Sequence, residues 1–244
     1  MIRRAALLLA LLLPIAAAAE EAGVLRTEAG VVARDGAATG AMVWLHPHYT
    51  EGPPPEAPAF MARLAARGWD LWRHDRPPGG PVPPASPLTS WVDPLAEGTA
   101  ALRARGYARV VLVGESRGAF LALAALRVPG LADAVALAAP AAHGRRPERR
   151  AQALADFAAA LDRASPDSVR RIALLLFEDD GWDPDPAARA ALFRAAVARL
   201  GWDALLVDRP PAPTGHGGVQ EPDFDAIFGR CLADFLEGRP AACP

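Results

Sequence analysis

The stretch from Arg109 to Leu126, RVVLVGESRGAFLALAAL, constrains the fold of this chain more than any other. It begins with four apolar residues, 110–113, as expected of a strand that is buried on both faces. The pattern Gly-x-Ser-x-Gly follows at 114–118, and strong helix formers follow from Ala119 on. Such a pentapeptide also arises by chance in a chain rich in Gly and Ala. Its place between a strand and a helix favours a sharp turn that presents the Ser116 hydroxyl above the sheet edge.

Strands and helices alternate along the rest of the chain, which is typical of a mostly parallel sheet covered by helices on both faces. Two short antiparallel strands are expected within Val24–Ala33, around Glu28-Ala29-Gly30. Further strands are expected at Met42–Leu45, Trp69–Arg73, Val110–Val113, Ala134–Ala138, Ile172–Phe177 and Ala204–Val207. Helices are expected at Ala59–Arg67, Asp93–Arg105, Ala119–Leu126, Pro147–Arg163, Ala187–Leu200 and Asp223–Leu236. We therefore expect one three-layer α/β domain over residues 20–244.

Residues 1–19 have the composition of a signal peptide. Arg3 and Arg4 give a positive start, a short apolar core follows at 5–13, and 16–19 are alanines suited to cleavage. An uncleaved membrane anchor is the alternative, but the apolar run is short for a bilayer span. The mature chain is therefore expected to begin near Glu20 or Glu21, in the periplasm or outside the cell, without stable membrane association.

The chain has only two cysteines, Cys231 and Cys243, close together near its C-terminus. In an oxidising compartment we expect them to form a disulfide between the tail and the last helix. Metal binding by this pair is not expected, because no cluster of histidines or cysteines accompanies it.

The charge composition excludes several classes of function. The formal net charge is −2, which gives no reason to expect nucleic acid or an anionic membrane as a partner. The sequence contains neither Lys nor Asn. A lysine Schiff base, a P-loop, a Ser-Lys dyad and a Cys-His-Asn arrangement are therefore excluded.

Several polar residues follow predicted strands, where the carboxyl ends of parallel strands form the usual ligand site. They are His46, Asp75, Ser116, Asp180 and His216. His216 is the best candidate base for Ser116, because a serine hydroxyl is a poor nucleophile until a base removes its proton. Its neighbours Gly215 and Gly217 let the backbone aim the ring. A plain surface histidine is the alternative.

An imidazole base needs an anionic partner that fixes its tautomer. The loop after the strand 172–177 offers several carboxylates, of which at most one has this role. We favour Asp180, a few residues beyond the strand, and keep Asp183 as the alternative because the following proline can fix its backbone. Asp179 and Asp185 are weaker candidates, and the other acidic side chains belong to a solvated loop.

A developing oxyanion needs hydrogen-bond donors. The backbone N–H of Arg117, directly after the serine, is one candidate. The second is expected from the loop after the strand 42–45, where Pro47 has no N–H, so His48 is the better donor, with Tyr49 behind it. A metal site at His46 and His48, with help from His74 and Asp75, is the alternative.

Taken together, the motif at 114–118, the order Ser116, Asp180, His216 and the His46-Pro47 loop resemble the α/β-hydrolase family. The stretch Asp75-Arg76-Pro77-Pro78-Gly79-Gly80 also resembles a loop of that family, and the resemblance extends from about 24 to 236. Two departures stand out: Pro47 replaces a common Gly, and Arg117 follows the serine where a smaller or apolar residue is usual. The charge of Arg117 is expected either to orient an anionic group or to pair with an acid such as Glu115.

The resemblance implies hydrolysis of an acyl bond through an acyl-enzyme, without a cofactor or a metal. We expect a small ester as substrate, because the segment between the strands at 134 and 172 leaves room for about one helix and no large lid. The Pro-rich loop at 77–87 is expected at the rim. For Trp91 and Trp182 we favour a place in the core, and a place at this rim is the alternative. The alternatives are a binding protein without catalysis, and an acyltransferase or a peptidase. The sequence predicts no oligomeric state.

Overall fold

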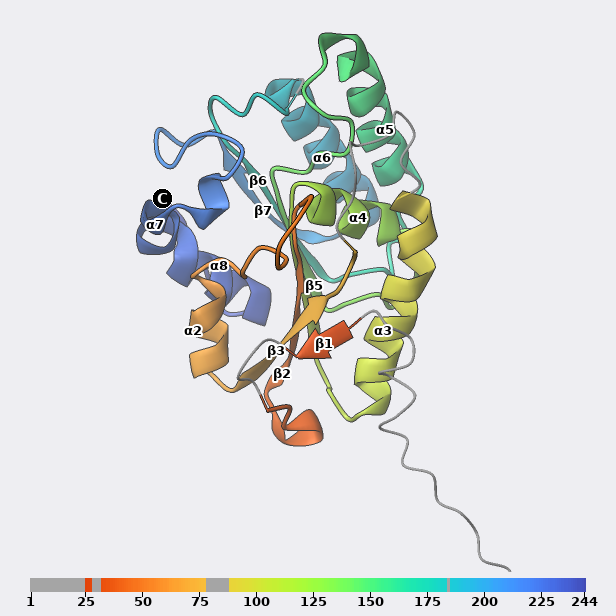
Figure 1. Ribbon diagram of the computed structural model, residues 1–244, viewed down its shortest axis with the longest axis vertical. Coiled ribbons are helices and arrows are strands. Elements are labelled where there is room, and N and C mark those ends of the chain that lie inside the picture. Colours follow the sequence, from red (N-terminus) through yellow and green to blue (C-terminus); the bar gives the residue numbers. More distant parts are fainter. Residues whose placement is uncertain (1–24, 28–31, 78–87, 184) are drawn as a thin grey trace, which may run out of the picture.

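The computed structural model describes residues 25–27, 32–77, 88–183 and 185–244 (Figure 1). Seven strands form one sheet in the order β1-β3-β2-β4-β5-β6-β7. Their bounds are β1 Leu25–Thr27, β2 Gly40–Leu45, β3 Trp69–His74, β4 Val110–Glu115, β5 Ala134–Ala138, β6 Arg171–Leu176 and β7 Asp203–Asp208. All neighbouring strands run parallel except β1, which lies antiparallel to β3. The mostly parallel sheet predicted from the sequence is confirmed.

Helices cover both faces of this sheet, as Figure 1 shows. One face carries α3 (Val92–Ala104), α4 (Arg117–Ala125), α5 (Arg150–Asp162) and α6 (Pro186–Leu200). The other face carries α2 (Met61–Ala66) and the C-terminal helices α7 (Pro222–Phe224) and α8 (Arg230–Glu237). The protein therefore has the three layers expected from the alternation of strands and helices.

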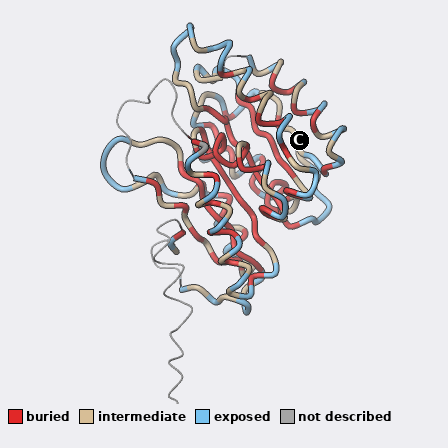
Figure 2. The backbone as a smooth tube through the Cα atoms, turned by 90° about the vertical axis from the view of Figure 1, so that its right-hand side faces the viewer, coloured by how far each residue is buried: buried red, intermediate tan, exposed pale blue. Residues whose placement is uncertain are grey.

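The central strand β4 explains why its sequence is apolar throughout. Val110 and Leu112 pack into the core below α3, α4, α5 and α6, whereas Val111 and Val113 pack into the core below α2 and α8. All four side chains are buried, because successive residues of a strand point to opposite faces and both faces are covered. Figure 2 shows the buried strands as a continuous red layer through the middle of the molecule.

The register brings the carboxyl ends of the central strands to one edge. Leu45 at the end of β2 lies opposite Gly114 in β4, and Glu115 lies opposite Ala138 at the end of β5. The loops that follow these strands therefore begin side by side. This is the physical basis for expecting the polar residues after the strands at one site.

The sequence-based expectation is wrong in the N-terminal segment. Among the described residues of this segment, β1 is the only strand, and Val32 and Ala33, expected in a second strand, are not in one. Val32 is 84% exposed, so it has no packing partner that would favour pairing with the sheet. Residues 28–31, where the turn between the two strands was expected, lie outside the described residues.

The last predicted helix is helical over its full length but is not one regular α-helix. Between α7 and α8, the segment Asp225–Gly229 forms a π-helical turn. The Asp225 carboxylate pairs with Arg63 of α2 at 2.7 Å and lies over Gly229, where a Cβ would collide with it. Tertiary pairing with a neighbouring helix thus accompanies the wider turn, which the local sequence does not signal.

The C-terminal tail is tied to α8. Cys231 and Cys243 form the expected disulfide, with their Cα atoms 5.3 Å apart. The predicted signal segment 1–19 lies outside the described residues, so it stays a prediction. Within the described part of the chain, no helix combines the length and the apolar character that crossing a bilayer requires.

Candidate active site

Ser116 occupies a strained turn between β4 and α4. Its φ of 51° lies in the left-handed region, which non-glycine residues rarely adopt. Its N–H donates to the carbonyl of Ala138 at 2.9 Å, and its own carbonyl accepts from Ala141 at 3.1 Å. These two bonds, one to the last residue of β5 and one to the loop after it, hold the serine at the sheet edge, where 8% of its surface is exposed.

The glycines on either side of the serine allow this turn by close approach rather than by unusual φ angles. A Cβ on Gly114 would come within 2.7 Å of the Cα of Ala119. A Cβ on Gly118 would collide with the carbonyl oxygen of Leu45. The Gly-x-Ser-x-Gly spacing is therefore required by the contact between β2, β4 and the first turn of α4.

His216 lies between the serine and a carboxylate, in the loop that follows β7. Its Nε2 is 2.8 Å from the Oγ of Ser116. Its Nδ1 is 2.9 Å and 3.0 Å from the two carboxylate oxygens of Asp180. The Asp180 side chain is 3% exposed and also accepts from the backbone N–H of Trp182 at 2.8 Å. This is the hydrogen-bond chain that activates a serine hydroxyl.

The other acidic residues of the same loop have different partners. Asp183, the alternative acid, forms an ion pair with the buried Arg189 at 3.2 Å. Burial raises the pKa of the Asp183 carboxyl, and the charge of Arg189 opposes that rise. Asp185 caps α6 by accepting from the N–H of Ala188 at 2.9 Å. Of the two acids favoured from the sequence, Asp180 is the one in contact with His216.

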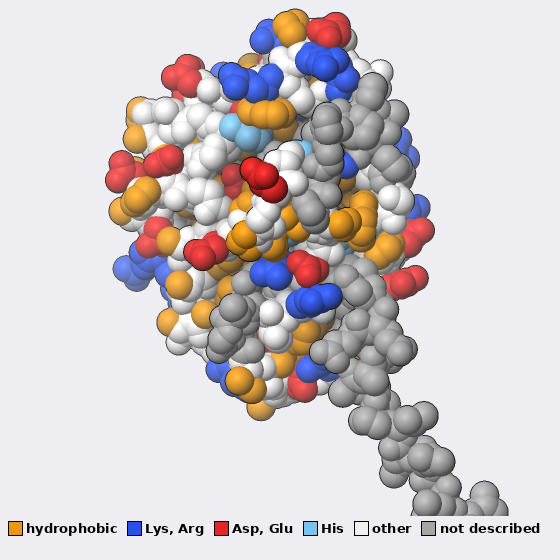
Figure 3. Space-filling model, viewed as in Figure 1, with side chains coloured by type: hydrophobic (Ala, Val, Ile, Leu, Met, Phe, Trp, Pro, Cys, Tyr) orange, Lys and Arg blue, Asp and Glu red, His pale blue; other side chains and the backbone are white. Residues whose placement is uncertain are grey.

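Trp182 belongs to the site rather than to the core, contrary to the interpretation favoured from the sequence. Its ring stacks on His216 with 5.2 Å between centroids and 27° between planes. The Arg145 guanidinium lies 5.9 Å from the Trp182 ring. In Figure 3, a histidine reaches the surface on the displayed face, beside arginine side chains. The His216 side chain is 21% exposed, so the candidate base is partly open to solvent, and an aromatic ring supports it.

Glu115, directly before the serine, is a buried carboxyl group that the sequence suggested only as a partner for Arg117. It is 4% exposed and accepts a 2.7 Å hydrogen bond from the Gln220 side chain. Burial raises its pKa, and the hydrogen bond from Gln220 and the proximity of His216 oppose that rise. It therefore binds Gln220, four residues beyond His216, and links the loop of the candidate base to the end of β4. Nothing in the local sequence around Gln220 signals this contact.

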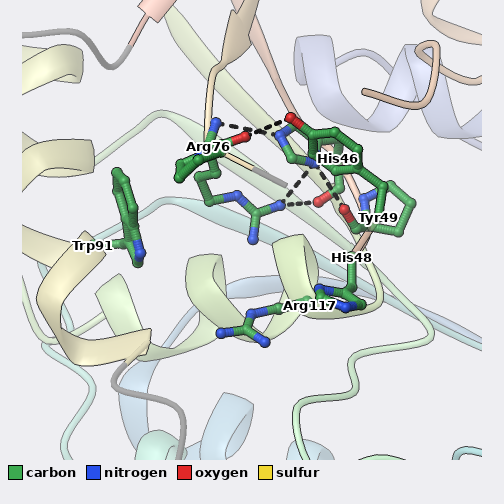
Figure 4. A pocket seen from close by; sticks show the side chains of 8 residues that line it. His46, His48, Tyr49, Arg76, Trp91 and Arg117 are labelled. Carbon is green, nitrogen blue, oxygen red and sulfur yellow. Dashed lines mark hydrogen bonds between the residues drawn. The ribbon is translucent and has the colours of Figure 1, made fainter. Parts of the chain in front are cut away.

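A pocket opens beside the serine turn, between the loops after β2 and β3 and the start of α4 (Figure 4). His48 and Arg117, the candidates for the oxyanion site, both line it. Arg117 is the first residue of α4, and the N–H groups in the first turn of an α-helix have no acceptor within the helix. Trp91 lines the same pocket and also packs against the core.

His46 faces Arg76 rather than a metal site. It is 1% exposed, and its ring nitrogens lie 3.4 Å from the backbone nitrogen and 3.2 Å from the side chain of Arg76. Burial, followed by the charge of Arg76, lowers the pKa of His46 to about 4. Among the described residues, no three His, Cys, Asp or Glu side chains are grouped closely enough to hold a metal ion.

No model of a known protein family matches the chain, and no characterised protein sequence is similar to it. Solved structures are similar in fold. One is dipeptidyl peptidase 4 from Porphyromonas gingivalis, with a TM-score of 0.59 and 16% identity, over 83% of this chain and 31% of the peptidase. The chain thus spans about a third of that larger protein.

Two smaller solved structures match over most of their own length. An esterase from Pyrococcus furiosus gives a TM-score of 0.58 at 12% identity, over 90% of this chain and 92% of the esterase. A lipase/esterase from Lactobacillus plantarum gives a TM-score of 0.56 at 15% identity, over 82% of this chain and 86% of the lipase/esterase. At such low sequence identities, the structural similarity shows a shared fold alone.

Proposed function

We propose that this chain, which has the α/β-hydrolase fold, is a serine hydrolase that cleaves a small ester through an acyl-enzyme at Ser116. One observation carries the proposal: a continuous chain of hydrogen bonds runs from Asp180 through His216 to the Ser116 hydroxyl. Three residues from three separate loops meet with the distances that nucleophilic catalysis requires. The esterases among the structures of similar fold are in keeping with this proposal.

In the proposed reaction, the Oγ of Ser116 attacks the ester carbonyl while Nε2 of His216 takes its proton. Asp180 holds the Nδ1–H of His216 and stabilises the resulting imidazolium. The backbone N–H groups of Arg117 and His48 are the proposed donors to the oxyanion. The imidazolium then protonates the leaving alcohol, and a water molecule, deprotonated by His216, hydrolyses the acyl-enzyme and restores the serine.

The test is the hydrolysis of 4-nitrophenyl acetate by the purified protein, together with labelling by a fluorophosphonate probe. We expect turnover and covalent labelling in the wild type, and neither in Ser116→Ala. Ser165→Ala, in the loop between α5 and β6, is the matched control and should retain both. Unchanged hydrolysis by Ser116→Ala would overturn the assignment of the nucleophile, and a folded wild type that reacts with neither reagent would favour a binding protein without catalysis.

Peptidase activity is the second candidate, because structures of similar fold include peptidases. Aminoacyl 4-nitroanilides, assayed beside the esters, separate the two: an esterase cleaves only the esters, whereas a peptidase cleaves both. An acyltransferase is recognised in the same assay by transfer of the acetyl group to an added alcohol.

We further propose that the protein acts in the periplasm or outside the cell. Residues 1–19 have the pattern of a signal peptide, and a disulfide joins Cys231 to Cys243, as is usual in oxidising compartments. Cell fractionation and N-terminal sequencing of the mature chain test this. An intact Met1 in a cytoplasmic fraction would contradict it.

A further inference from the structure

The pocket beside the serine turn has a distinctive lining. Its volume is about 150 Å³. The side chains labelled in Figure 4 come from the loops after β2 and β3, from the start of α3 and from the start of α4. They are His46, His48, Tyr49, Arg76, Trp91 and Arg117. The described lining contains two guanidinium groups and no carboxylate.

Arg76 is an unusual residue to find buried in this way. Only 6% of its surface is exposed. Its Nη2 donates to the carbonyl oxygen of His46, and the buried Nε has no hydrogen-bond partner among the described residues. None of the described carboxylates forms an ion pair with it. Burying a positive charge without a negative partner is costly, so this arrangement favours an anion that enters the pocket.

Arg117 brings a second positive charge to the same pocket. It is the first residue of α4 and directly follows the candidate nucleophile. Burial lowers the pKa of the Arg76 guanidinium to about 10, and the charge of Arg117 contributes to this effect. Burial, followed by the charges of Arg117 and Arg76, also lowers the pKa of His48. The two like charges therefore interact across the pocket, and a bound anion would relieve their repulsion.

We infer that this pocket, in the serine hydrolase proposed above, binds a carboxylate or a similar anionic group of the substrate between Arg76 and Arg117. A guanidinium group offers its N–H donors in a planar fork that matches a carboxylate. Because Arg117 directly follows Ser116, the anionic group is carried by the same small molecule whose ester lies at the serine. The inference rests on the proposed function and adds a substrate class to it: small esters that bear a negative charge.

The anionic group belongs either to the acyl part or to the leaving group, and matched substrates distinguish the two. For the acyl part, monomethyl succinate, glutarate and adipate are compared with their neutral dimethyl esters. For the leaving group, 3-carboxyphenyl acetate is compared with its neutral methyl ester. Hydrolysis is followed in a pH-stat. We expect kcat/KM of the wild type to be at least about tenfold higher for the anionic member of one of these pairs.

Variants of Arg117 test the residue itself. Arg117→Ala and Arg117→Gln keep the backbone N–H, and we expect each to lower the ratio of anionic to neutral kcat/KM by roughly 10- to 100-fold. Arg230→Ala, which removes an exposed arginine on α8, should leave the ratio unchanged. The inference would be overturned if the wild type had an anionic-to-neutral ratio of kcat/KM at or below one in both substrate series. It would also be overturned if both Arg117 variants kept the wild-type ratio.

A binding measurement separates failure of this inference from failure of the proposed function. Ser116→Ala protein is titrated calorimetrically with the monomethyl esters and with the dimethyl esters. We expect binding of the anionic esters that weakens when Arg117→Ala is added. Such binding without any turnover or probe labelling of the wild type would support the pocket and overturn the hydrolase. Turnover of neutral esters without anion preference in catalysis or in binding would leave the hydrolase and overturn the pocket.

Discussion

The Nε2 of His216 lies 2.8 Å from the Oγ of Ser116, although the two residues are 100 positions apart in the sequence. The serine follows the central strand β4, and the histidine follows β7 at the margin of the sheet. Their contact therefore depends on the register of β4, β5, β6 and β7 together.

Asp180→Asn should lower kcat by about 10⁴-fold, because the amide no longer fixes the tautomer of His216 or stabilises its cation. Asp183→Asn should retain most of the activity, since Asp183 contacts Arg189 instead. Its cost should appear in stability, because the buried Arg189 loses its ion-pair partner. Steady-state kinetics with 4-nitrophenyl acetate and thermal melting measure both effects. A greater loss of activity in Asp183→Asn would reverse the assignment of the acid.

Trp182→Leu should lower kcat/KM by about 2- to 10-fold, which corresponds to the free energy of one aromatic contact. The Trp182 ring stacks on His216, and its face attracts the imidazolium that forms during the reaction. Trp182→Phe retains an aromatic face and should keep most of the activity. Equal losses in the two variants would show that the stacking has no part in the effect.

Gly118→Ala should destabilise the fold by about 1–3 kcal/mol or prevent folding, because the new Cβ collides with the Leu45 carbonyl. Gly217→Ala is the matched control, since a Cβ there meets no atom within 4 Å. Its stability should stay within about 0.5 kcal/mol of the wild type. Urea unfolding followed by circular dichroism measures both. A stable Gly118→Ala protein would contradict the close approach of β2 and α4.

Acid should destabilise the protein through His74. Burial, followed by the charge of Arg76, lowers the pKa of His74 to about 3, and neither ring nitrogen has a hydrogen-bond partner among the described residues. The unfolded chain therefore binds this proton first as the pH falls. The free energy of unfolding therefore has its full value, as far as His74 is concerned, above about pH 6.5. Between about pH 6.5 and pH 3 it falls by about 1.4 kcal/mol per pH unit.

Urea unfolding at pH 7 and at pH 5 measures this loss. His74→Phe should lose roughly 2 kcal/mol less between the two pH values than the wild type. The comparison is made within each protein, so a constant packing cost of the substitution cancels. The same pH dependence in both proteins would show that His74 does not titrate as expected. The pKa of His46 is also lowered, so part of the pH dependence of stability should remain in His74→Phe.

Much of the fold could be predicted because its signals are local. The apolar run 110–113 marks a strand buried on both faces, and Gly106 and Gly201 mark helix ends. The second N-terminal strand was predicted from a short apolar run after Gly30 and is absent at Val32 and Ala33. The π-helical turn at Asp225–Gly229 escaped prediction, because it accompanies a contact with Arg63, 162 residues away.

The sequence predicts which loops form the candidate site, but not which side chains contact one another there. The order of elements places Ser116 and His216 at one edge, and proximity to the strand end favours Asp180. The partners of the competing acids could not be predicted, because Arg189 approaches Asp183 only after α6 has packed. The same holds for Trp182 on His216 and for Gln220 on Glu115, which depend on how loops far apart in sequence meet.

The place of the candidate base at the margin of the sheet has a further consequence. In the part of the chain that the structure describes, β7 pairs with β6 alone, and Asp203 and Ala204 at its start are exposed. Marginal strands detach at lower free energy than central ones. Activity should therefore be lost when β7 detaches, before the rest of the sheet unfolds. As the urea concentration rises, activity should vanish while the fluorescence of the buried Trp44 and Trp69 is still that of the native protein.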